Sequence, residues 1–190
     1  MTRLFLVRHG PTHAKSMVGW SDIPADLSDT AQIARLDAFI PKDAIVISSD
    51  LIRASATADA ITGERTRLPH DPNLREINFG DWELQQFDAI EDQDHIRQYW
   101  DYPGDIRPPN GESWNEVSER VTHAVDGLMR SYPGSDFIIV AHFGAILTQV
   151  QHALRITAYE TFSHRIDNLS VTELHLVDRK WHAERINHLP

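Results

Sequence analysis

The sequence predicts an α/β fold in which a mostly parallel β-sheet is covered by helices on both faces and carries an antiparallel edge. Three apolar runs rich in β-forming residues alternate with helix-like segments; they lie at residues 2–8, 44–48 and 136–141. Continuous apolar runs indicate strands buried on both faces, as in parallel sheets. Near the C-terminus, residues 170–178 and 180–187 are two further strand-like segments, which predicts a hairpin at the sheet edge.

Helices are expected in the intervals between these strands. The predicted helices cover residues 28–40, 50–63, 111–132, 143–154 and 157–164. The first begins at Ser28 or Asp29 and ends before Pro41, and Gly63 ends the second. Residues 65–70 are interpreted as a short strand, and residues 73–110 as irregular.

Length and charge restrict the classes of function. A chain of 190 residues is long enough for one well-buried domain, so we expect a single domain over 1–190. A net charge of −10 disfavours nucleic acid and anionic membranes as partners. The absence of cysteine excludes disulfides and thiolate catalysis. The first apolar run is too short for a signal peptide, and no run is long enough for a membrane helix. We therefore expect a cytoplasmic protein, either a monomer or a homodimer.

Basic side chains follow each of the three apolar strands. Arg8 and His9 follow the first, Arg53 lies shortly after the second, and His142 follows the third. Because ligands bind beyond the carboxyl ends of parallel strands, these side chains should meet at one edge of the sheet. Guanidinium groups pair with phosphate oxygens, and a neutral imidazole is a competent nucleophile toward phosphorus. The sequence therefore predicts a site for a phosphoryl group.

Arg53 supports this interpretation by its position in a helix. It falls in the first turn of the predicted helix 50–63, capped by Ser49 or Asp50, where a cation opposes the helix dipole by about 0.3–1 kcal/mol. An anion bound in front of the helix would offset that cost. The alternative is a surface arginine paired with Asp50 or Asp59.

Six segments of the chain resemble the motifs of one enzyme family. In chain order they are LFLVRHGPT, SSDLIRASATA, LREINFGDWE, PNGES, IIVAHFGAI and INHL. This series resembles the histidine phosphatase superfamily, also called phosphoglycerate mutase-like. The resemblance implies a three-layer α/β/α fold, with a lid insertion at about 77–111, and a metal-independent phosphomonoester hydrolase that works through a phosphohistidine. No cofactor and no metal are implied.

The resemblance also implies roles for individual residues. His9 would be the nucleophile, and Arg8, Arg53 and His142 would bind the phosphoryl group. Glu76 would protonate the leaving oxygen, which requires a carboxyl that is protonated near neutral pH. The alternative for Glu76 is a loop carboxylate paired with the neighbouring Arg75.

Two other glutamates and several departures from the family pattern lie in or near the matched motifs. Glu83 is expected to help open a lid helix, and Glu112 to lie in the first turn of the long helix. Pro11 and Leu84 replace the Glu and Gly that the family usually has at those positions. Lys15 replaces an Asn and is a further candidate phosphate-binding residue, with a solvated loop lysine as the alternative. His13, four residues after His9, is separated from it by Gly10-Pro11, which disfavours a shared metal.

Aromatic residues are concentrated at residues 79–114, which include most of the expected lid. They are Phe79, Trp82, Phe87, Tyr99, Trp100, Tyr102 and Trp114. Together with the short lid, this stretch resembles α-ribazole phosphatases, so a small phosphorylated substrate such as α-ribazole 5′-phosphate, stacked on these rings, is one hypothesis. The alternative is that the rings only pack under the lid. A phosphoglycerate mutase, or a module that binds phosphorylated ligands without turnover, remain alternative functions.

Overall fold

A five-stranded mixed sheet forms the centre of the computed structural model, which describes all 190 residues. The order is β2-β3-β1-β4-β5, and the strands are β1 (Thr2–Arg8), β2 (Ile45–Ser48), β3 (Phe137–Ala141), β4 (Val171–Val177) and β5 (Lys180–His188). The first three strands of this order are parallel, whereas β4 pairs antiparallel with both β1 and β5. The predicted α/β fold with an antiparallel edge is therefore confirmed.

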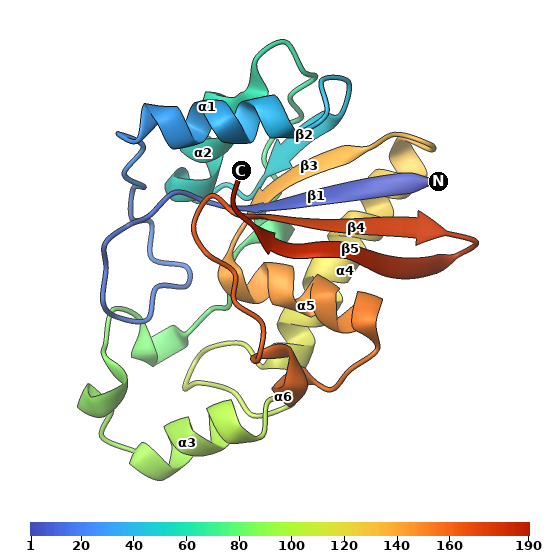
Figure 1. Cartoon of the computed structure of the whole chain (residues 1–190). Coiled ribbons are helices and arrows are strands. Elements are labelled where there is room, and N and C mark those ends of the chain that lie inside the picture. Colours follow the sequence, from blue (N-terminus) through green and yellow to red (C-terminus); the bar gives the residue numbers. More distant parts are fainter.

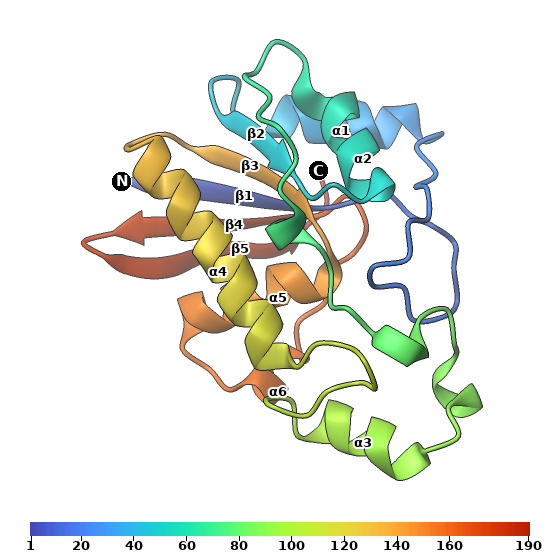
Figure 2. The ribbon, with the colours of Figure 1, turned by 180° about the vertical axis from the view of Figure 1, so that it is seen from behind.

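The sheet has a buried surface on each face. Along β1, Leu4 and Leu6 face one hydrophobic cluster while Phe5 and Val7 face the other. Helices α1 (Thr30–Phe39) and α2 (Ile52–Thr62) cover the second face (Figure 1). Helices α4 (Trp114–Ser131) and α5 (Phe143–Leu154) cover the first, as the reverse view shows (Figure 2). Alternation of apolar side chains within each strand is what permits this three-layer arrangement.

The hairpin and the helix ends follow local sequence signals with a few differences. Asp178 and Arg179 have φ values of 49° and 61°, the left-handed pair that a tight hairpin turn requires. Helix α4 begins at Trp114 with a capping box between Ser113 and Glu116. Glu112 therefore precedes the helix, and its predicted place in the first turn is wrong.

The start of α2 also differs from the prediction. Neither Ser49 nor Asp50 caps this helix, whose N-cap is Leu51. Instead, Asp22 accepts a hydrogen bond from the Ile52 N–H at 2.7 Å, so the cap comes from a distant loop. The predicted strand at 65–70 is reduced to one bridge between Val46 and Arg67, and α6 is limited to Ala158–Thr161.

Residues 73–110 contain more structure than the sequence predicted. They include the helix α3 (Gln93–Asp101), and three short 3₁₀ turns occupy or border the segment at Pro72–Leu74 (η1), Gly80–Trp82 (η2) and Phe87–Ala89 (η3). Helix α3 buries only Ile96 and Tyr99, which leaves too short a periodic signal to identify from sequence.

Most aromatic residues of this region are packed in the core. Phe79, Trp82, Tyr99 and Trp114 are each no more than 6% exposed. Trp82 and Tyr99 meet edge to face with ring centroids 5.4 Å apart, and Tyr99 meets Trp100 in the same way at 4.9 Å. These observations favour the packing alternative for the four buried rings.

Leu84 is one of eight non-glycine residues whose backbone has a positive φ. Leu84, which replaces the family's glycine, has φ = 61° and is 54% exposed. A side chain in the left-handed region costs roughly 1–2 kcal/mol, and little buried area offsets that cost here. We predict that Leu84→Gly raises the free energy of unfolding by about 1 kcal/mol, measured by urea denaturation.

A matched control for this prediction is Val177→Gly. Val177 is 38% exposed and lies in a strand, where glycine costs about 0.5–1 kcal/mol. A loss of stability in both variants would show that the conformation of Leu84 is not strained.

Candidate active site

The pairing of β1 with β3 brings the two predicted histidines together. Arg8 is in register with Ala141, so the next residue of each strand, His9 and His142, leaves the sheet at the same edge. Their ring centroids are 5.1 Å apart. The convergence predicted from the strand ends is what the structure contains.

His9 is held as a neutral ring in which one nitrogen is unprotonated. Its Nδ1 lies 2.7 Å from the carbonyl oxygen of Gly10. A carbonyl can only accept, so Nδ1 carries the proton and Nε2 the lone pair. Arg53 Nε donates to this Nε2 at 3.3 Å. Burial, followed by the positive charge of Arg53, lowers the pKa of His9 to about 3.

Two buried polar atoms beside His9 have no partner. His142 is completely buried; its Nε2 lies 2.6 Å from Ser49 Oγ, but its Nδ1 is unpartnered. Burial and then the charges around it lower the pKa of His142 well below its usual value. Arg8 donates from Nη1 to the Ile166 carbonyl at 2.6 Å, whereas its Nε is also unpartnered. Buried polar atoms without partners are rare, and these two mark a place where a polar ligand could bind.

Arg53 is a buried residue rather than a surface one. It is 1% exposed, and it donates to the carbonyl oxygens of Ser21 and Gly19 at 2.8 and 2.6 Å. The alternative of a surface pair with Asp50 or Asp59 is therefore wrong. Burial lowers the pKa of Arg53, but an arginine still remains charged at neutral pH.

Glu83 holds the loop that contacts Arg53. Its carboxylate accepts from the N–H groups of Gly19 and Trp20 at 3.0 and 2.7 Å and from Ser21 Oγ at 2.7 Å. The expectation that Glu83 opens a lid helix is wrong, because it is instead the C-cap of η2. Its role is to fix the conformation of residues 19–21.

Glu76 is bound to the first turn of α5. Its carboxylate accepts from the N–H groups of Gly144 and Ala145 at 3.0 and 3.2 Å, next to His142. A Cβ atom at Gly144 would lie 2.5 Å from Glu76 Oε1, so this contact requires glycine. The alternative pairing of Glu76 with Arg75 is wrong, since Arg75 binds Asp50 at 2.7 and 2.6 Å.

A loop that follows α6 supports the end of β1. Asn168 donates from Nδ2 to the carbonyl oxygen of His9 at 2.9 Å, and Arg8 contacts Ile166 in the same loop. Asn187, from the closing INHL motif, donates to Asp167 Oδ2 at 2.9 Å and accepts from the Asp167 N–H at 2.6 Å. The sequence identifies the INHL motif but gives no sign of the contact between Asn187 and Asp167, which lies 20 residues earlier.

The remaining candidates lie outside this cluster. Lys15 is exposed and makes no ion pair. His13 is exposed and pairs with Asp26 at 2.8 Å, away from His9. No group of three or more His, Cys, Asp or Glu side chains is arranged to hold a metal ion. No helix is long and apolar enough to cross a membrane.

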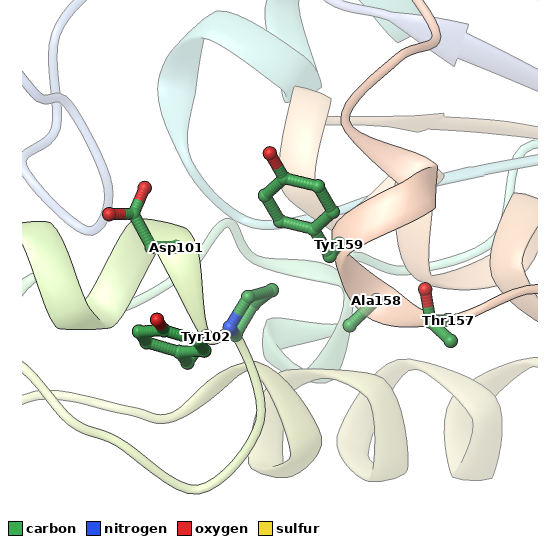
Figure 3. Close-up of a pocket in the computed structure, with 6 residues that line it drawn as sticks. Asp101, Tyr102, Thr157, Ala158 and Tyr159 are labelled. Carbon is green, nitrogen blue, oxygen red and sulfur yellow. The ribbon is translucent and has the colours of Figure 1, made fainter.

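An open groove lies elsewhere on the molecule (Figure 3). It has a volume of about 770 Å³ between the end of α3 and α6, and it is lined by Asp101, Tyr102, Pro103, Thr157, Ala158 and Tyr159. Tyr102 is one of the aromatic residues offered for substrate stacking, but no residue of the histidine and arginine cluster lines this groove.

The fold and the site together define a class of enzyme. A neutral buried histidine between two arginines, at the carboxyl ends of a parallel sheet, is an arrangement suited to phosphoryl transfer. The chain belongs to the histidine phosphatase superfamily (branch 1), whose family model matches residues 4–189. This confirms the family suggested by the motifs, and the protein is a histidine phosphatase.

Individual relatives cover almost the whole chain. A probable phosphoglycerate mutase GpmB of Serratia proteamaculans is 30% identical over 191 residues, covering 96% of this chain and 89% of the relative. Among solved structures, YhfR of Bacillus stearothermophilus is 27% identical with a TM-score of 0.88, covering 97% and 96% of the two chains. An α-ribazole phosphatase of Shigella flexneri, at 23% identity and a TM-score of 0.81, covers 98% and 96% and shows the shared fold.

The lowered pKa of the buried histidines predicts a loss of stability in mild acid. Below the unfolded-state pKa of about 6.5, the unfolded chain binds protons that His9 and His142 do not bind in the folded protein. The free energy of unfolding should therefore fall by about 2 kcal/mol for His9 between pH 7 and pH 5, and His142 should add to the fall in the same direction. Urea denaturation in phosphate-free buffer measures this.

The variant His9→Gln should show a fall smaller by about 2 kcal/mol over that interval. The exposed His182→Gln serves as the control and should behave like the unmodified protein. If the two variants have the same pH dependence, His9 is not held neutral by the fold.

Proposed function

We propose that the protein hydrolyses small phosphomonoesters in two steps through a phosphohistidine at His9. In the first step, His9 Nε2 attacks phosphorus and the bond from phosphorus to the leaving oxygen breaks, while Glu76 gives that oxygen a proton. In the second step, Glu76 takes a proton from water as the water attacks phosphorus. The bond from Nε2 to phosphorus then breaks, releasing phosphate and the neutral ring.

The single observation that supports this most strongly is the pair of unpartnered donors around a neutral nucleophile. Arg8 Nε and His142 Nδ1 are buried without acceptors. If the Ser49 hydroxyl donates to His142 Nε2, the ring proton is on Nδ1, and both atoms are donors. Phosphoryl oxygens placed against His9 would satisfy them, and Arg53 would supply further positive charge.

Glu76 is placed for both halves of the reaction. The N–H groups at the start of α5 hold its carboxylate next to His142. In the first step the carboxyl gives its proton to the leaving oxygen, and in the second step the carboxylate takes a proton from water. One residue therefore serves first as the acid and then as the base.

The substrate class is proposed at two levels. The coarser proposal is a small phosphorylated metabolite, with residues 77–111 as the lid over the site. The finer hypothesis, α-ribazole 5′-phosphate, loses support from stacking, because four of the aromatic rings at residues 79–114 are buried in the core.

Lys15 is exposed, so it would contact substrate only if its loop turned toward the site. We further propose a cytoplasmic location, without nucleic acid or membrane partners, and a monomer or homodimer.

Mutase activity is the second candidate, because the curated relatives carry that name. A glycerate carboxylate would need a cation in the lid. Arg97 lies near Asp94 and Arg107 pairs with Glu116, and both arginines are exposed. This favours hydrolysis. Steady-state kinetics with 3-phosphoglycerate and α-ribazole 5′-phosphate at one pH, together with detection of free phosphate, distinguishes the two activities.

His9→Ala should abolish the phosphoenzyme and lower turnover by several orders of magnitude, because no other side chain presents a nucleophile at this place. Rapid quenching with labelled para-nitrophenyl phosphate should trap acid-labile, base-stable phosphate on the unmodified protein. His13→Ala, a change at an exposed histidine in the same loop, is the control. Substantial turnover by His9→Ala would disprove the mechanism.

Glu76→Gln should slow the hydrolysis of alkyl phosphates by about 10²–10⁴-fold, and that of para-nitrophenyl phosphate much less. Glutamine keeps the size and polarity of the side chain but has no proton to give to a poor leaving group. The measurement is kcat/KM on both substrates. Equal losses on both would point to a different acid or to structural damage.

A further inference from the structure

Glu76 lies on a segment without regular structure that must nevertheless be held accurately. It is located between η1 and η2, and Figure 2 shows η1 beside α4. The carboxylate meets the backbone N–H groups of α5, and Gly144 leaves no space between them. A shift of the main chain around Glu76 would therefore break these contacts.

Arg120 of α4 contacts the main chain of this segment. From Nη1 it donates to the carbonyl oxygens of Asn73 and Arg75 at 2.8 and 3.0 Å. From Nη2 it donates to the carbonyl oxygen of Glu76 itself at 3.1 Å. One guanidinium thus accounts for three backbone acceptors in a stretch that has no strand partner.

Glu112 fixes the orientation of this guanidinium. Its two carboxylate oxygens accept from Arg120 Nε and Nη2, each at 2.9 Å. Its Oε2 also accepts from the Asn78 N–H at 2.9 Å, and its own N–H donates to the Asn78 carbonyl at 2.8 Å. All five N–H donors of Arg120 are used, and the ion pair is mostly buried, at 14% and 19% side-chain exposure.

The carbonyl oxygen of Glu76 that accepts from Arg120 also contacts the loop at residues 19–21, which holds Arg53 in place. Trp20 donates from Nε1 to the carbonyl oxygen of Glu76 at 2.8 Å, and Arg120 lies 6.0 Å from the Trp20 ring centroid. Trp20 belongs to the loop whose carbonyls hold Arg53. The segment that carries Glu76 and the loop at residues 19–21 therefore meet next to Arg120.

From this geometry we infer that Arg120, oriented by Glu112, is a positioning residue that sets the place of the Glu76 carboxyl for the proposed proton transfer. It does not touch the reacting atoms. The inference rests on the proposed role of Glu76 as the acid. A lysine has three donors at one point and cannot reproduce the planar contacts of a guanidinium, so the role requires arginine.

The test compares Arg120→Met with a matched buried arginine. Arg65 likewise donates to backbone carbonyls, those of Pro41, Ile61 and Ile40 among them, and pairs with Asp37, on the other face of the sheet. Loss of either side chain should destabilise the fold. Only Arg120→Met should slow alkyl phosphate hydrolysis by about tenfold or more relative to para-nitrophenyl phosphate, because only it displaces the acid.

A double-mutant cycle with Glu76→Gln then isolates the route of the effect. Once the acid is gone, adding Arg120→Met should cost no more than about twofold in kcat on alkyl phosphate. Arg120→Lys should resemble Arg120→Met in this comparison. Should Arg120→Met fail to fold, Glu112→Gln is the milder variant that loosens the same guanidinium, and a smaller loss in the same direction is expected.

Three outcomes overturn the inference. They are equal slowing of both substrates by Arg120→Met, the same substrate dependence in Arg65→Met, and a full additional loss when Arg120→Met is combined with Glu76→Gln. If Glu76→Gln slows the hydrolysis of both substrates equally, Glu76 is not the acid and the proposed function fails. This failure is distinguishable from failure of the inference, because it is measured in a variant whose Arg120 is unchanged.

Discussion

Two buried arginines with one buried carboxylate, Glu76, beside them are the constraint on which this structure depends. Arg8 and Arg53 are both largely desolvated, and burial lowers the pKa of each. Glu76 is the buried carboxylate beside them. The two cations help to keep His9 and His142 neutral, and neutrality leaves His9 with the lone pair that a nucleophile needs. A phosphoryl dianion would balance the charge and supply acceptors to the unpartnered donors.

The fold maintains this unbalanced site through loops rather than through regular elements. The carbonyl oxygens of Gly19, Ser21 and Ile166 accept hydrogen bonds from the Arg53 and Arg8 guanidinium groups. Each of these loops is itself held by a polar side chain, Glu83 for the first and Asn187 for the second. Catalytic residues often lie on loops that a rigid sheet supports. Here the strand ends determine where His9 and His142 leave the sheet, and the buried polar contacts hold the surrounding loops in place.

The strand ends were predictable from sequence because their signals are local. A buried apolar run ending in Arg8-His9, and another ending in His142, needs only the parallel register to become one site. The place of Arg53 in the site was predicted from its position after a strand, in the first turn of a helix, whereas the place of Glu76 needed the family motifs. Family resemblance therefore supplied what spacing alone left open.

Contacts between distant loops were not predictable from sequence. Asp22 caps α2 from 30 residues away, and Arg120 reaches Glu76 across 44 residues. Helix α3 was missed because it buries only Ile96 and Tyr99, and a helix with so little apolar surface resembles a loop in sequence. The number of aromatic residues at 79–114 is plain in the sequence, but only the structure distinguishes the rings that pack from the rings that face solvent.

A structure of the protein with bound vanadate, which mimics a phosphoryl group in transfer, tests the central claim most directly. The account predicts a bond from vanadium to His9 Nε2, with vanadate oxygens within hydrogen-bonding distance of Arg8 Nε and His142 Nδ1. Vanadate bound to another side chain, or bound with these two atoms still unpartnered, would contradict it.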